Sequence, residues 1–180
     1  MSEQSSLYAR INIRKEDLAA YLKSSIKPIT QYSEWLEWSS KIEFYGEISK
    51  EDLLAEQFLN LKTTQEYLNM YLSEKFVFNL FDYNEEKEQL VISILQFSEN
   101  VMDCIRMMHV IGGIVNYKNT DTTDFAIFYD FMWELEPTNY LEIVKGEGRI
   151  RYEIPDVLIL EANNYLSERR EIASRQYVEK

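Results

Sequence analysis

The sequence has one cysteine and one histidine, and this scarcity excludes several kinds of site. Cys104 has no second cysteine with which to form an internal disulfide, so the reducing cytoplasm is the expected compartment. A structural zinc site built from cysteine and histidine needs more of these residues than the chain has. Cys104 and His109 are five positions apart on an expected helix and point about 140° from one another, a poor geometry for a nucleophile and its base. We therefore expect both to be core residues.

Glycine and proline are also few, with five and three in 180 residues. We find no linker, low-complexity tract or internal repeat, which favours a single domain over residues 1–180. No apolar run approaches the roughly eighteen residues of a membrane-spanning helix, and the first ten residues lack the apolar segment of a signal peptide. The glycine-rich patterns of nucleotide-binding loops and the GxSxG pattern of hydrolases are absent too. We expect a cytoplasmic protein that needs no cofactor and does not bind membranes.

Hydrophobic residues make up 46% of the chain and aromatic residues 14%, which excludes bulk disorder in spite of a net charge of −12. The charge is unevenly distributed. Residues 51–144 hold seventeen acids and five bases, whereas 1–50 and 145–180 each hold seven of both. Such a field repels nucleic acid and attracts basic proteins. The alternative is that the acidity only keeps the protein soluble.

Alternation and helical spacing predict an α+β fold with a mostly antiparallel sheet and helices packed on one face. The acidic β-β-α-β portion covers residues 76–136, and the end of the last helix is expected to fray after about Arg169. The strands are expected over 7–13, 42–48, 76–82, 89–97, 122–136, 141–143 and 150–154. The helices are expected over 15–23, 32–39, 50–61, 63–72, 98–115 and 156–172.

The stretch 122–136 is the expected organising strand. One face is wholly apolar and should pack against the core. It consists of Phe125, Ile127, Tyr129, Phe131, Trp133 and Leu135. The opposite face mixes acidic and apolar side chains, namely Asp124, Phe128, Asp130, Met132 and Glu134. Apolar anchors ringed by charge are typical of protein interfaces, so this face is a candidate partner-binding surface. A second helical layer that covers Phe128 would explain the same pattern.

The segment DYNEEKE at 82–88 predicts an acidic turn between two strands. Its acids Glu85, Glu86 and Glu88 are candidates for steering a basic partner. The turn faintly resembles half a calcium loop, but Lys87 stands where that loop needs glycine and Ser93 where it needs a bidentate glutamate. We therefore expect no metal site here.

These features favour a small binding protein that occludes a basic protein partner one to one. The class that fits best is an immunity protein that neutralises a bacterial toxin domain. One alternative is a secretion chaperone, which would form a homodimer and hold a partly unfolded client. Others are a nucleic-acid mimic that inhibits a nuclease, and a carboxylate-dependent enzyme that uses Asp121 with Asp124 or Asp130 with Glu134. No catalytic motif supports the enzyme.

Overall fold

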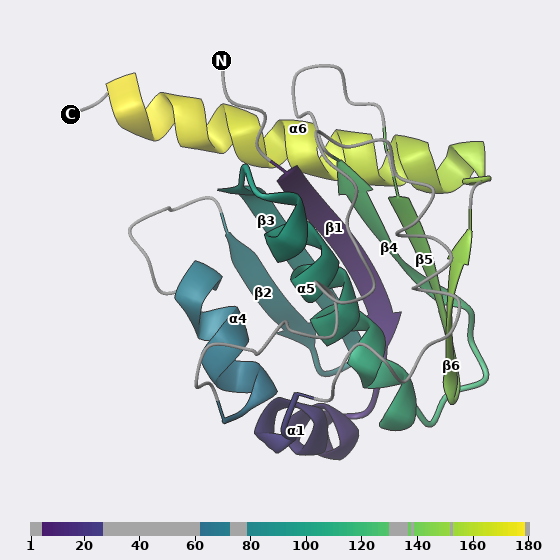
Figure 1. The fold of residues 1–180 in the computed structure, drawn as a ribbon. Helices are drawn as coiled ribbons and strands as arrows, with labels where there is room; N and C mark the ends of the chain where they lie inside the picture. Colours follow the sequence, from purple (N-terminus) through teal and green to yellow (C-terminus); the bar gives the residue numbers. More distant parts are fainter. Residues whose placement is uncertain are drawn as a thin grey trace.

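A computed structural model of the chain describes residues 5–26, 62–72, 79–129, 137, 139–151 and 153–178. These residues form a six-stranded sheet with helices on both sides (Figure 1). The strands are β1 (Ser5–Asn12), β2 (Leu80–Asn84), β3 (Gln89–Ser98), β4 (Asp124–Tyr129), β5 (Asn139–Val144) and β6 (Glu147–Arg151). The helices are α1 (Lys15–Lys23), α4 (Thr64–Leu72), α5 (Val101–Gly112) with the 3-10 turn η2 (Gly113–Asn116), and α6 (Asp156–Val178).

The strand order is β2-β3-β1-β4-β5-β6, and every neighbouring pair is antiparallel. The predicted α+β class with an antiparallel sheet is confirmed. The strands predicted on either side of 82–88 form the hairpin of β2 and β3, and those predicted over 141–143 and 150–154 overlap the hairpin of β5 and β6. The second turns at Gly146, whose φ of +77° is a backbone conformation that glycine adopts without strain. β1 lies between β3 and β4, so the first strand of the chain is central in the sheet.

One face of the sheet is covered by α1, α4, α5 and η2. The apolar side chains between this face and the helices form one buried cluster. It includes Leu7, Ala9 and Ile11 of β1, which alternate along the strand with residues of the other face. From α5 the cluster receives an apolar stripe that includes Cys104, Ile105 and Met108. Cys104 is 2% exposed, so its expected place in the core is confirmed.

The opposite face is covered by α6. Its buried residues Ala162 and Leu166 share a cluster with Tyr8 of β1 and with Phe125 of β4. The Tyr8 hydroxyl donates a hydrogen bond to Glu161 Oε1 at 2.8 Å, which ties the helix to the central strand. The prediction that helices pack on one face alone is therefore wrong, because α6 adds a second layer on the other face.

Two helix starts show how local sequence sets the element bounds. Thr63 and Glu66 form a capping box, since Glu66 N–H donates to Thr63 Oγ1 at 3.2 Å and Thr63 N–H donates to Glu66 Oε2 at 3.0 Å. The helix predicted from residue 98 begins later than expected, at Val101. Asn100 is the N-cap, and its side chain accepts the Met102 N–H at 2.9 Å.

Several expected elements lie outside the described residues. These are the helices predicted over 32–39 and 50–61, the strand predicted over 42–48 and the part of the organising strand that follows Tyr129. Among the helices that the structure describes, none has the length and apolar character that crossing a bilayer requires.

Candidate functional site

The acidic face predicted on the organising strand is not a surface in the described part of β4. Asp124 is 2% exposed and Phe128 is fully buried. Phe128 lies in the cluster that α5 helps to form, while Phe125 and Ile127 lie in the cluster under α6. The prediction that Asp124 and Phe128 face a partner is therefore wrong, because helices cover both sides of the strand.

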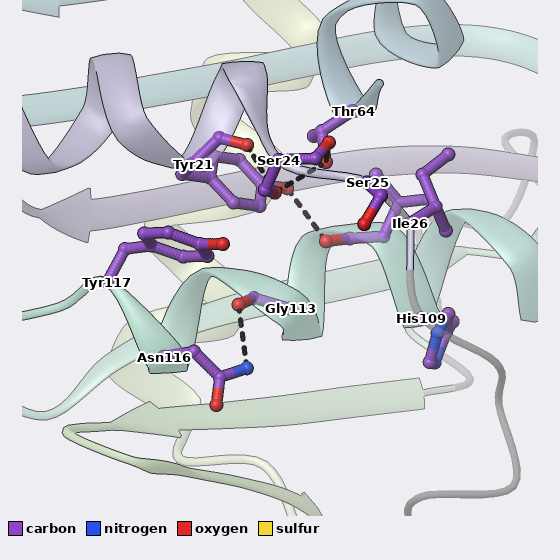
Figure 2. A pocket seen from close by; sticks show the side chains of 10 residues that line it. Tyr21, Ser24, Ser25, Ile26, Thr64, His109, Gly113, Asn116 and Tyr117 are labelled. Atoms are coloured by element: carbon purple, nitrogen blue, oxygen red, sulfur yellow. Dashed lines mark hydrogen bonds between the residues drawn. The ribbon is translucent and has the colours of Figure 1, made fainter. Parts of the chain in front are cut away.

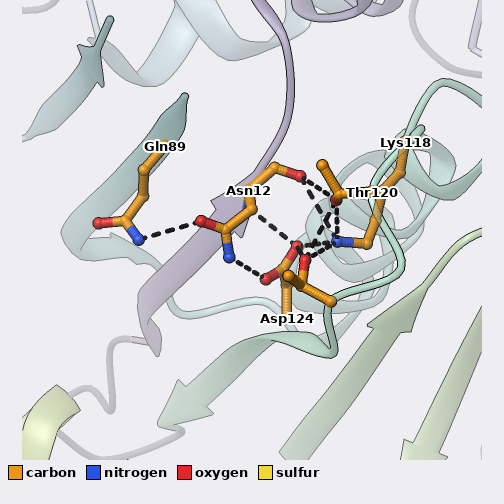
Figure 3. Close-up of polar contacts among 6 residues, drawn as sticks. Asn12, Gln89, Lys118, Thr120 and Asp124 are labelled. Carbon is orange, nitrogen blue, oxygen red and sulfur yellow. Dashed lines mark hydrogen bonds and ion pairs between the residues drawn. The ribbon is translucent and has the colours of Figure 1, made fainter. Parts of the chain in front are cut away.

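Asp124 is buried because it pairs with a buried lysine, as Figure 3 shows. Lys118 Nζ donates to Asp124 Oδ2, and also to Thr120 Oγ1 at 2.8 Å and Thr122 Oγ1 at 2.7 Å. The other carboxylate oxygen, Oδ1, accepts a hydrogen bond from Asn12 Nδ2 at 2.6 Å. Asn12 N–H donates to Oδ2 at 2.8 Å. Both charges are thus satisfied within the protein, and neither is offered to a partner.

Asp130, Met132 and Glu134 lie outside the described residues, so their role in binding stays a prediction.

The three glutamates of the β2–β3 turn are exposed, as a steering surface requires. Glu85, Glu86 and Glu88 follow one another around the turn with Lys87 between them. Glu88 has φ +48°, and Lys87 N–H donates to the side chain of Asn84 at 2.9 Å, which fixes the shape of the turn. Among the described residues no cation forms an ion pair with Glu86 or Glu88. We call these three glutamates the acidic turn.

The acidic turn lies beside the start of α1. Ile13 N–H donates to Glu88 C=O at 2.8 Å, and the Tyr83 hydroxyl donates to Ile13 C=O at 3.0 Å. Lys15 Nζ lies 2.5 Å from Glu85 Oε1. These contacts join two parts of the chain that are seventy residues apart. They hold the turn in a defined position against the helix.

The charges around the turn act on the neighbouring titratable groups. The pKa of Tyr83 is raised, chiefly by partial burial and then by the carboxylates of Glu88, Glu16 and Glu85. The hydrogen bond from Lys15 to Glu85 raises the pKa of the Lys15 ammonium. Glu16 thus belongs to the same negative region. This grouping has no signal in the sequence, because residues near 16 and near 85 meet only in the folded chain.

A second candidate is a small hollow between the end of α1, the start of α4 and the α5–η2 segment (Figure 2). It offers about 20 Å³ to water-sized molecules, which is room for one or two waters. Two of the polar groups at its wall already have partners inside the protein. The Tyr21 hydroxyl donates to Val110 C=O at 2.7 Å, and the Ser24 hydroxyl donates to Tyr21 C=O at 2.6 Å. The hollow is too small for a metabolite.

His109 lines the same hollow and is 3% exposed. It lies in α5 with Cys104, and the structure keeps both side chains inside the protein. Within the described ranges, no group of three or more histidine, cysteine or acidic side chains is arranged to hold a metal ion. The exposed acidic turn is therefore the candidate site that the structure favours.

Comparisons with protein-family models, with curated proteins and with solved structures found no match for this chain.

Proposed function

We propose that this protein binds and occludes a basic protein partner, and that it does so as the immunity protein of a bacterial toxin. The observation that carries the proposal is the acidic turn. Its three carboxylates are exposed and held in a fixed position, and two of them have no ion-pair partner among the described residues. Carboxylates placed in this way steer a cationic partner and set its orientation.

The net charge of −12 supports a basic partner, since it opposes the approach of nucleic acid phosphates. Solubility alone requires charge but no particular position for it. The contacts of the turn with Ile13 and Lys15 do give it a position. Asp124 and Phe128 have no part in the proposed interface, because both are buried.

The chaperone alternative needs a broad apolar surface for its client. The large apolar side chains that the structure describes as exposed are Met70 on α4 and Val157 and Leu160 on α6. Two neighbouring side chains on a helix and one on another element fall short of such a surface. For this reason the inhibitor is the function we put forward.

The test is capture of the partner by tagged protein in cell extract of the source organism, at low and then at high salt. We expect wild type to retain a basic protein at low salt, and the triple variant Glu85→Lys, Glu86→Lys, Glu88→Lys to lose it. The matched control is Glu153→Lys, Glu168→Lys, Glu171→Lys, which changes the charge equally at exposed positions outside the acidic turn.

The control variant should still retain the partner, and the captured protein should have a toxic activity that wild type inhibits. Equal losses in the two triple variants would show that only net charge matters. Retention of the partner by the acidic-turn variant would remove the turn from the interface.

A further inference from the structure

The outermost strand β2 has an edge that no other strand among the described residues covers, and we call it the open edge. β2 pairs with β3 from Leu80 to Asn84 and ends the sheet on that side. On the side away from β3, its main-chain groups form no hydrogen bond with any residue that the structure describes. Figure 1 shows β2 at the margin of the sheet, with the acidic turn at its end. Unpaired N–H and C=O groups at a sheet edge are a template for a further strand.

The other edge strand, β6, is protected by charge. It carries Glu147, Arg149 and Arg151, and these side chains form ion pairs. Arg149 pairs with Glu147 at 2.5 Å, and Arg151 pairs with Glu142 of β5 at 2.9 Å. Charged side chains of both signs are a common protection of an edge against pairing. β2 has a single charged residue, Asp82, so the two edges differ in the partner that they admit.

The two faces of β2 differ in chemistry. Asp82 and Asn84 are exposed and lie on one face, whereas Phe81 and Tyr83 lie on the other and pack partly against the core. A strand added at this edge would meet a carboxylate on one side and aromatic side chains on the other. Its best sequence therefore alternates lysine or arginine with an apolar residue.

The charge also argues against a second copy of this chain as the occupant. Antiparallel pairing of two β2 strands about Asp82 would place the two Asp82 carboxylates opposite one another. Like charges in that position are destabilising. A cationic strand, by contrast, is attracted by Asp82 and then by the acidic turn.

We propose that the open edge of β2 takes up an extended segment of the partner as a seventh strand, and that this segment carries alternating cationic and apolar side chains. The inference rests on the proposed function, since it assigns the docking mode of the basic partner. The acidic turn attracts the segment, and the main chain of β2 binds it.

The probe for this docking mode is a blocked heptapeptide of alternating lysine and valine, titrated into ¹⁵N-labelled protein. We expect the outward-pointing amides of β2 to become protected from exchange at every second residue. The same peptide methylated on every backbone nitrogen keeps its charge but loses its backbone N–H hydrogen-bond donors. It should bind at least about tenfold more weakly, because several hydrogen bonds are lost.

Two protein variants provide the matched comparison. Asp82→Lys should weaken binding of the lysine–valine peptide, while Glu147→Lys on the other edge should leave it unchanged. Amide spectra of both variants report whether the sheet is intact. If Asp82→Lys does not keep the sheet, Asp82→Asn replaces it and should also weaken binding.

Several results would overturn strand addition. One is equal binding of the methylated peptide, and another is binding without protection of β2. Either of these two results would still be consistent with charge attraction between the acidic turn and the peptide, and would not contradict the proposed function. The inference also fails if the free protein dimerises with β2 protected, or if a captured basic protein needs the acidic turn but leaves β2 unprotected. If neither the peptide nor any basic protein binds, the proposed function fails with it.

Discussion

Lys118 and Asp124 form an ion pair in which neither side chain reaches solvent, with 0% and 2% exposure. The pair connects the loop after η2 to the start of β4. Through Asn12 it also binds the end of β1, where Asn12 N–H and Nδ2 both donate to the carboxylate. An ion pair so placed specifies how the two central strands meet at this end of the sheet.

Asp124→Asn should strongly destabilise the protein, because it leaves the buried Lys118 ammonium without its counter-charge. Removal of one partner of a buried pair costs about 3–5 kcal/mol. Urea unfolding measures this cost as a fall in the free energy of unfolding. Asp121→Asn, at an exposed position of the same loop, is the control and should change little. A fall below about 1 kcal/mol for Asp124→Asn would show that the pair is unimportant for stability.

Phe128→Ala should lower the free energy of unfolding by about 3–5 kcal/mol, since it removes a fully buried ring and leaves a cavity. Leu160→Ala, at a residue 61% exposed, is the matched apolar truncation and should be close to neutral. The measurement is again urea unfolding. If Phe128→Ala instead leaves stability unchanged and weakens partner capture, Phe128 is a surface anchor and its assignment to the core is incorrect.

The free energy of unfolding should fall as the pH rises above 10. Burial raises the pKa of Tyr21, and of Tyr67, above the ordinary value of 10.0. The unfolded chain loses these protons near pH 10 while the folded protein keeps them. Stability from this source is complete below pH 10 and is lost as the pH rises toward the folded pKa. Each such tyrosine contributes a slope of about 1.4 kcal/mol per pH unit.

Urea unfolding at pH 9, 10 and 11 checks this slope. Tyr21→Phe should show a smaller loss between pH 10 and 11, because one titrating hydroxyl is gone. Its free energy of unfolding at pH 9 should already be lower, since the hydrogen bond to Val110 C=O is lost. A wild-type protein as stable at pH 11 as at pH 9 contradicts the prediction.

Asn100→Ala should cost about 1 kcal/mol of stability through loss of the N-cap of α5. Thr123→Ala, at an exposed loop position, serves as the control. Asn100→Asp keeps a capping oxygen and adds a negative charge at the helix N-terminus, so it should retain wild-type stability. Thermal or urea unfolding of the three variants gives the ranking. Equal stability of Asn100→Ala and wild type would exclude a capping role.

The elements that follow from local patterns were predictable from the sequence. The helix at 15–23, the hairpin of β2 and β3 and the strands β5 and β6 each depend on residues close together in the chain. Their spacing and turn chemistry are therefore visible without the fold.

The surface of β4 was not predictable in the same way. An aspartate and a phenylalanine on one strand face are typical of an exposed, partner-binding face when no covering layer is known. Two contacts of the folded chain show that this face is buried. Lys118 neutralises Asp124, and Phe128 lies in the core cluster to which α5 contributes. The acidic turn was predictable as a cluster, but its contacts with Ile13 and Lys15 were not, since they join distant residues.

The bond between Tyr8 and Glu161 spans 153 positions of the chain. During synthesis, the face of the sheet that α6 covers therefore stays exposed to solvent until that helix has emerged from the ribosome. Tyr8, Phe125 and Ile127 all precede α6 in the chain, so they lack their cover until that helix has been synthesised. A nascent chain without α6 therefore exposes this apolar cluster, and exposed apolar surface of this kind makes a chain prone to aggregate.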